Sequence, residues 1–77
     1  MRIARRESRY VVCVSDGGYR ASLVVRRIYR VVQDAAARKR GLIRVIDESG
    51  EDYLFPRSLF EPLDIPRAVI RKLAMAT

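Results

Sequence analysis

Short runs of hydrophobic residues separated by polar turns fill most of the chain, a pattern typical of an all-β domain. The first run, residues 10–14 (Tyr-Val-Val-Cys-Val), is apolar throughout and rich in β-branched side chains, which predicts a strand buried on both faces. Residues 15–18 (Ser-Asp-Gly-Gly) predict a tight turn after this strand, because glycine reaches the positive φ values that such turns need.

Residues 21–32 predict a second strand region with a bend near Arg26. In its later part, Arg26 and Arg30 fall on one side of the strand and Tyr29 and Val31 on the other, which fits the period of two that is typical of a half-buried strand. This alternation predicts that Tyr29 and Val31 point inward, whereas Arg26, Ile28 and Arg30 point outward.

The centre of the chain predicts a helical turn followed by a hairpin. Asp34 is a favourable N-cap for residues 35–40, and Gly41 suits the position just after a helix. Residues 42–46 and 52–55 then predict two strands joined by a polar turn that contains a glycine.

The last third predicts a 3₁₀ turn at residues 57–59 and a brief fifth strand at 60–62, because Pro56 cannot donate a backbone hydrogen bond and so ends the fourth strand. Asp64 is expected to cap a helix over about 64–75 that has Pro66 in its first turn and lies on the strands. We therefore expect one domain over 1–77, namely a five-stranded small barrel at about 9–62 with a short C-terminal helix. The expected core residues are Val12, Val14, Leu23, Tyr29, Val31, Val45 and Phe55.

The run from Tyr53 to Phe60 resembles the end of an SH3 domain, where a strand passes through a proline and a 3₁₀ turn into the last strand. Eukaryotic SH3 domains read proline-rich ligands with a Trp and with a Tyr three residues after that proline; this chain has no Trp and has Leu59 at the second position.

The chain is also similar to small uncharacterised bacterial and phage proteins that share Ser-Leu, Gly-Lys-x-Tyr-x-Val, Ile-Asp-x-x-Gly-Glu-Asp-Tyr and an aromatic-Pro pair. The matching residues are Ser22-Leu23, Tyr29, Val31, Ile46-Asp47, Gly50-Glu51-Asp52-Tyr53 and Phe55-Pro56. Arg26 stands where the shared pattern has its first glycine. The resemblance implies an SH3-like barrel and brings no established activity with it.

Charge and composition narrow the classes of function. Sixteen basic residues against nine acidic ones give a net charge of +7, which favours association with polyanions such as RNA or DNA. The chain has no histidine, so it lacks the usual general base near neutral pH and the commonest neutral metal ligand. We therefore expect a binding module rather than an enzyme, with no cofactor and no small-molecule substrate.

The start of the chain and its cysteine content bear on localisation. Cys13 is the single cysteine and cannot form an internal disulfide, and residues 1–9 contain no apolar segment of a signal peptide. No apolar run approaches the roughly 20 residues of a membrane-spanning helix. These features predict a cytoplasmic protein that does not span a membrane.

Three other groups of residues could carry chemistry. Cys13 lies in an apolar strand without a His partner, which favours a buried thiol over a nucleophile. The turn at residues 47–52 holds four carboxylates, which we interpret as a solvated hairpin tip, with a bound cation as the alternative. Gly17 and Gly18 are interpreted as a plain turn, with a phosphate cradle as the alternative.

The cationic residues of the second strand region, the third strand and the loop between them predict a continuous surface, here called the basic strip. One hypothesis is that the strip binds nucleic acid; a charged, solvated face is the alternative. Tyr29 and Tyr53 are interpreted as buried barrel aromatics rather than as base-stacking residues. The candidate nucleic-acid-binding residues are Tyr19, Arg20, Arg26, Arg30, Arg38, Lys39, Arg40 and Arg44.

A second hypothesis, from another class, is a protein-interaction or accessory module. A small barrel leaves strand edges that can accept a peptide strand, and the apolar side of the C-terminal helix could meet a partner. On the helix, the candidate partner-binding residues are Ile70, Leu73 and Met75.

Overall fold

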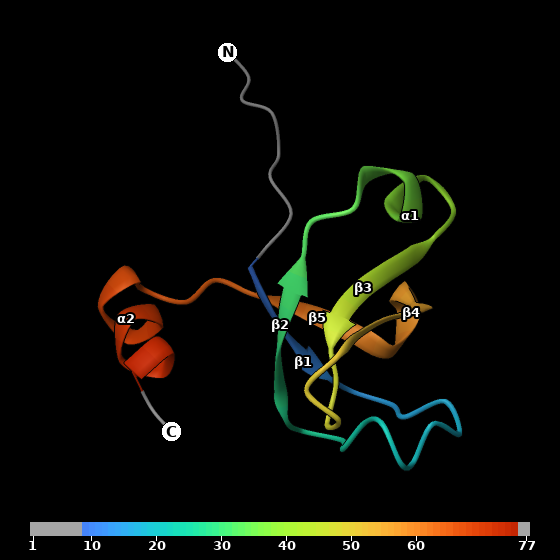
Figure 1. Cartoon of the computed structure of the whole chain (residues 1–77), viewed down its shortest axis with the longest axis horizontal. Coiled ribbons are helices and arrows are strands. Elements are labelled where there is room, and N and C mark those ends of the chain that lie inside the picture. The colour runs from blue at the N-terminus through green and yellow to red at the C-terminus, as the bar shows by residue number, and fades with distance from the viewer. Residues whose placement is uncertain (1–8, 76–77) are drawn as a thin grey trace.

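The chain folds into short strands with one helix between the second and third strands and a second helix after the fifth strand (Figure 1). The computed structural model describes residues 9–75, with side chains described for residues 9–72. The elements in chain order are Tyr10–Cys13 (β1), Ile28–Val32 (β2), Ala35–Lys39 (α1), Leu42–Ile46 (β3), Asp52–Pro56 (β4), the 3₁₀ turn Arg57–Leu59, Phe60–Leu63 (β5) and Arg67–Met75 (α2).

The five strands form one antiparallel sheet in the order β4-β3-β2-β1-β5. The last strand of the chain therefore lies beside the first, and β4 and β5 are the two edges of the sheet. This arrangement confirms a small, mostly β fold of five strands with a short C-terminal helix. The sheet is open, so the expected closure into a barrel is not seen between β4 and β5.

The inner face of the sheet carries the core. The core consists of buried residues from the strands, the β1–β2 loop and the 3₁₀ turn, namely Val11, Cys13, Leu23, Tyr29, Val31, Ile43, Val45, Phe55, Leu59 and Phe60. Five expected core residues are confirmed: Leu23, Tyr29, Val31, Val45 and Phe55.

The expected register of β1 is wrong by one residue. Val11 and Cys13 are buried, Val12 is half-buried, and Val14 is 47% exposed just after the strand ends. A one-residue shift moves every side chain of a strand to the other face. Val11 pairs with the inward-facing Tyr29 of β2, and this pairing is what turns Val11 rather than Val12 toward the core.

The connection between β1 and β2 is a long loop, residues 14–27, where the sequence predicted strand from residue 21 onward. Leu23 anchors this loop in the core with only 2% of its surface exposed. Arg26 adopts φ 76°, in the left-handed region that favours glycine, and its backbone N donates to the Cys13 carbonyl at 2.7 Å. A tight bend therefore forms at Arg26, as expected, although the side chain is not that of glycine.

Gly17 permits a close approach inside the same loop. It has φ +57°, and a Cβ built there would lie 2.9 Å from the Cδ2 atom of Leu59, which is buried. A side chain at this position would meet both backbone strain and a clash with the core. The turn interpretation of the glycine pair agrees with this packing.

The centre of the chain folds as its local signals predict. Asp34 caps α1 and accepts a hydrogen bond from the Ala37 N at 3.0 Å, and Gly41 follows the helix with φ +75°. The strands β3 and β4 pair from Leu42 opposite Pro56 to Ile46 opposite Asp52. Pro56 then leads into the 3₁₀ turn and β5.

The C-terminal helix differs from expectation in its start and its position. It begins at Arg67, where the Pro66 carbonyl accepts from the backbone N atoms of Val69 and Ile70, so Asp64 is not its N-cap. Figure 1 shows α2 standing beside the sheet rather than packed onto it. The side chain of Leu73, a residue of the helix expected to lie on the strands, is outside the described residues.

Candidate functional site

The residues of the basic strip differ in exposure and in ion pairing. Arg30 projects from the outer face of β2 and is exposed. Arg44 of β3 is half-buried, and its Nε donates to Asp34 Oδ2 at 2.9 Å. The hydrogen bond from the Ala37 backbone, together with the contact from Arg44, holds the pKa of Asp34 below its usual value. Arg44 is therefore paired within the protein, whereas Arg30 is not paired with any described carboxylate.

The remaining members of the strip lie on other elements. Arg38, Lys39 and Arg40 are exposed at the end of α1, which Figure 1 shows well away from α2. Arg26 is exposed in the bend after Val25 rather than in a strand. The structure thus places the three cations of α1 away from α2 and pairs Arg44 of the strip with Asp34.

The aromatic candidates differ in how deeply they are buried. Tyr29 is buried, as expected, but Tyr53 is 48% exposed, and its hydroxyl donates to Glu51 Oε1 at 2.9 Å. The interpretation of Tyr53 as a core aromatic is therefore wrong. Tyr19 is exposed beside the equally exposed Arg20, and its ring meets the edge of Phe55 at 5.1 Å between centroids.

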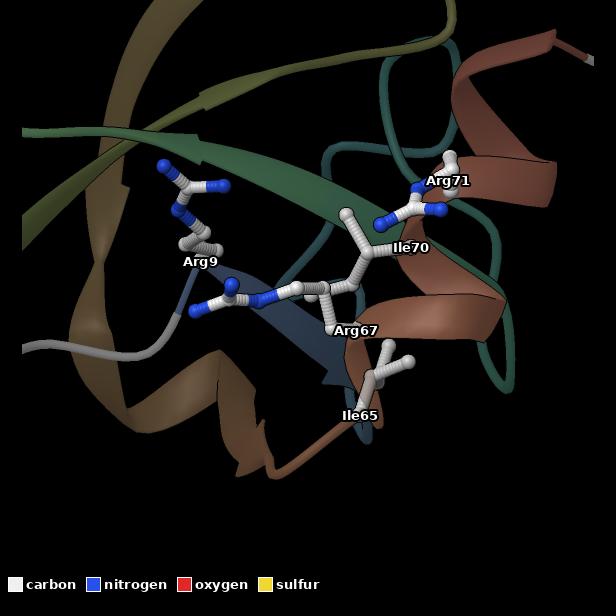
Figure 2. Close-up of a pocket in the computed structure, with 5 residues that line it drawn as sticks. All are labelled: Arg9, Ile65, Arg67, Ile70 and Arg71. Carbon is white, nitrogen blue, oxygen red and sulfur yellow. The ribbon is translucent and has the colours of Figure 1, made fainter.

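A different cluster of arginines surrounds a hollow between α2 and the start of β1. The hollow has a volume of about 570 Å³ and is lined by Arg9, Ile65, Arg67, Ile70 and Arg71. Figure 2 shows Arg67, Ile70 and Arg71 projecting from α2 into this space, and Arg9 reaching it from the residue before β1. Three arginines and two isoleucines thus line one hollow.

A second, larger hollow of about 1070 Å³ adjoins the first, and both are lined by Arg9 and Ile70. We call the two together the α2 groove. The larger hollow runs along β2 and adds Tyr10, Ile28 and Arg30 to the lining. Tyr10 belongs to the outer face of β1 and pairs with Arg30 across the strands.

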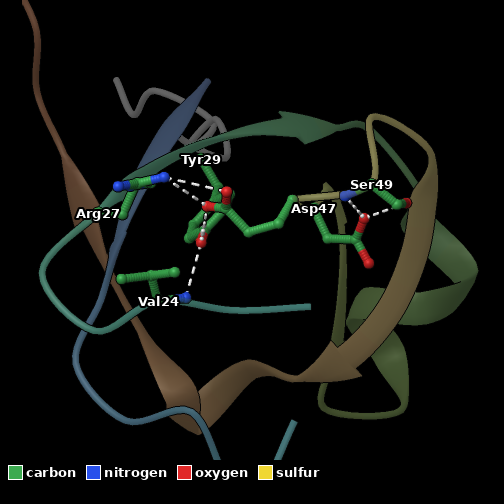
Figure 3. A network of polar contacts seen from close by, with 6 residues as sticks. Val24, Arg27, Tyr29, Asp47 and Ser49 are labelled. Carbon is green, nitrogen blue, oxygen red and sulfur yellow. Dashed lines mark hydrogen bonds and ion pairs between the residues drawn. The ribbon is translucent and has the colours of Figure 1, made fainter. Parts of the chain in front are cut away.

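Two carboxylates line the larger hollow, and both are held by other residues (Figure 3). Asp47 is buried, and its Oδ1 accepts from the N and Oγ atoms of Ser49. Burial alone would raise the pKa of Asp47, but these hydrogen bonds outweigh it and leave the pKa lowered. Glu48 accepts from the Arg27 guanidinium at 3.0 Å and from the Tyr29 hydroxyl at 2.5 Å.

Tyr29 links this hairpin to the β1–β2 loop. Its hydroxyl donates to Glu48 and accepts from the Val24 N at 2.8 Å, and the Glu48 N donates to the Ser22 carbonyl at 3.0 Å. These hydrogen bonds tie the loop to the hairpin beside Glu48, one of the residues that line the larger hollow.

We expect Tyr29→Phe to lower the free energy of unfolding by about 1–2 kcal/mol, because it leaves the Val24 N and the Glu48 carboxylate without their shared partner. Tyr53→Phe is the matched control, since it removes a hydroxyl bonded only at the exposed surface, and it should change stability little. Urea unfolding followed by circular dichroism measures both variants. Equal effects of the two substitutions would contradict the role assigned to the Tyr29 hydroxyl.

The same network predicts how the effect of Tyr29→Phe varies with pH. Burial and the hydrogen bond to Glu48 raise the pKa of Tyr29 from 10.0 to about 12, so between these values the unfolded chain loses the proton while the folded chain keeps it. The stabilisation is therefore complete below pH 10 and is lost as the pH rises toward 12. The stability difference between the natural chain and Tyr29→Phe should shrink over this window.

The sequence reasoning missed Arg9, Tyr10, Arg67 and Arg71 as site residues. The C-terminal helix was expected to lie on the strands, and its arginines were not singled out. One signal was present: cations in the first turn of a helix oppose its dipole, and Arg67 begins α2 without an acidic residue beside it. Such an unfavourable placement can mark a binding position.

The other candidate groups are placed as follows. Cys13 is a buried free thiol, as expected, and burial is the main cause that raises its pKa. Within the described part of the chain, no three potential ligand residues among His, Cys, Asp and Glu cluster closely enough to hold a metal ion. Over the same residues, neither helix is long and apolar enough to cross a membrane.

Comparison of the chain with protein-family models, with curated protein sequences and with solved structures finds no match.

Proposed function

We propose that the protein is a nucleic-acid-binding module that contacts phosphates with the arginines of the α2 groove. The observation that carries the proposal is the grouping of Arg9, Arg67 and Arg71 around one hollow. Only two ion pairs form among the side chains of residues 9–72, and both involve other arginines, Arg27 and Arg44. The groove arginines therefore have their charge available for an external anion.

The arrangement is unfavourable for the protein by itself. Arg67 and Arg71 are four residues apart on α2, so their like charges repel each other on one side of the helix. Arg67 also lies in the first turn, where the helix dipole favours anions. A bound phosphate would relieve both repulsions, and a nucleic-acid backbone supplies phosphates at regular spacing.

In this proposal the residues of the basic strip make only part of the contact with nucleic acid. Arg30 belongs to both surfaces, because it projects from β2 and lines the larger hollow. The cations of α1 lie farther away and would contact a longer nucleic acid only outside the groove. The main binding surface thus extends from β2 toward α2.

We also propose that the fold is an SH3-like barrel. The strand order, with β5 beside β1, supports this, and so does the passage from β4 through Pro56 and a 3₁₀ turn into β5. Catalysis forms no part of the proposal, since the described carboxylates that line the groove are held by Ser49, Arg27 and Tyr29.

Fluorescence anisotropy with labelled single-stranded RNA, single-stranded DNA and duplex DNA tests the proposed function. At about 50 mM salt we expect dissociation constants below about 10⁻⁴ M, and an affinity that falls steeply as salt is added, because phosphate contacts release counterions. No anisotropy change with any probe at about 10⁻⁴ M protein would overturn the proposal.

A second candidate is the protein-interaction module, and the position of α2 favours it. A nine-residue helix that stands beside the sheet, with Val69 44% exposed, leaves apolar surface for a partner. Ile70 is half-buried in the groove, and the side chains of Leu73 and Met75 lie outside the described residues. The protein-interaction function becomes the leading one if no nucleic acid binds.

A further inference from the structure

We propose that the α2 groove prefers single-stranded nucleic acid and that Tyr10 provides the contact for an unpaired base. This inference rests on the proposed function and adds to it the form of the ligand. It is carried by the larger hollow of the groove, where apolar and aromatic side chains lie beside the arginines.

The side chains of the larger hollow suit a base better than a phosphate. Ile28 is 46% exposed there, and Ile70 faces the same space from α2. Val32 and Ile46, both half-buried, extend the apolar lining. Hydrocarbon gives a phosphate nothing to replace its hydration, whereas the flat face of a nucleobase loses little by leaving water as long as its polar edges stay hydrated.

Tyr10 adds an aromatic ring to this lining. Because Val11 and Cys13 face the core, Tyr10 faces the outer side of the sheet, and its cross-strand neighbour is Arg30. The ring is half-buried, so part of its surface is open to the hollow. Stacking of a base on an aromatic side chain, with an arginine nearby for the phosphate, is the usual physical basis of single-strand binding.

The charges of the groove orient the strand. The larger hollow is lined by Asp47 and by Glu48, which is paired with Arg27, and Arg67 and Arg71 line the neighbouring hollow. Asp47 repels phosphates, and Arg27 is already paired with Glu48, so the backbone should follow Arg9 and the α2 arginines while a base enters beside Tyr10. The volume of the larger hollow, about 1070 Å³, exceeds the roughly 300–1,000 Å³ of pockets that hold drug-sized ligands. One or two nucleotides therefore fit in it.

A duplex fits this groove less well. Its bases are paired and stacked in the interior, so it can offer phosphates to the arginines but no free base to Tyr10 or Ile28. At equal salt, the chain should therefore bind a single strand more tightly than a duplex that contains the same strand.

The test compares a labelled single-stranded DNA with its duplex by anisotropy at one salt concentration. We expect tighter binding of the single strand, and we expect Tyr10→Leu to weaken that binding by about five-fold or more, as loss of one stacked base does. The salt dependence of the remaining affinity should not change, because no charge is removed. Tyr53→Leu is the matched control: Tyr53 is exposed on β4 and lies outside the lining of the groove.

Ile70→Gln keeps the test decisive if Tyr10→Leu does not fold, because Ile70 lies on α2, beside the sheet rather than in its core. It should also weaken single-strand binding and leave duplex binding nearly unchanged. Equal affinity for the two probes, or full single-strand binding by both folded variants, would overturn this inference while leaving the proposed function in place. Absence of binding to both probes would overturn the proposed function itself.

Discussion

Leu23→Ala is expected to lower the free energy of unfolding by about 2–5 kcal/mol, the largest stability effect that we predict. Leu23 comes from the β1–β2 loop, yet it is among the largest fully buried side chains, with 2% exposure. Truncation leaves a cavity in a core shared by all five strands and the 3₁₀ turn. Domains of this size are stable by only about 4–12 kcal/mol, so the variant should be partly unfolded near 37 °C.

Val25→Ala is the control for this prediction, because Val25 lies two residues away in the same loop and is 41% exposed. Its effect should stay within about 0.5 kcal/mol. Urea titrations of both variants give the two free energies directly. Similar small values would mean that the loop is not anchored by Leu23 and that its shape depends on the backbone bonds alone.

The sequence predicted the strands best where its pattern determined which face each residue joins. Tyr29 and Val31 lie on either side of Arg30, so an outward Arg30 turns both of them inward. Residues 10–14 are apolar at every position, and nothing local distinguishes Val11 from Val12. Pairing with β2 determines that Val11 faces the core. This pairing is a tertiary contact, and the residue pattern of one strand cannot reveal it.

The bend at Arg26 shows a similar limit. A glycine would have indicated positive φ, but Arg26 gives no such signal in its own chemistry. The residue is held there because its N bonds to the Cys13 carbonyl, while the Cys13 N bonds to the Arg27 carbonyl at 2.9 Å. These two bonds join the loop to β1 and start the pairing of β1 with β2.

The candidate site was only partly predictable, for a geometrical reason. Arg30 could be placed on the outer face of β2 from alternation alone. The grouping of Arg9 with Arg67 and Arg71 joins residues almost sixty positions apart, and it depends on α2 standing beside the sheet. A helix packed onto the strands, as the sequence suggested, would have placed the same arginines on an ordinary solvated face.

Replacement of Arg9, Arg67 and Arg71 by glutamine is expected to weaken binding of single-stranded nucleic acid by about 10²-fold or more at 50 mM salt. Each phosphate contact contributes about 0.7 to the slope of log K against log salt for single strands, so three lost contacts should lower that slope by about 2. The loss should be similar for unrelated sequences, because phosphate contacts carry no base information. Glutamine is a good helix former, so α2 should remain helical.

A second triple variant removes the same charge elsewhere: Arg38→Gln, Lys39→Gln and Arg40→Gln on α1. If the α2 groove is the main binding surface, this variant should retain most of the affinity and most of the salt slope. If instead the α1 variant loses more affinity than the groove variant, the cations of the basic strip carry the binding, and the groove assignment is wrong. Equal losses in both variants would mean that net charge alone, rather than the grouping of Arg9 with the α2 arginines, holds the nucleic acid.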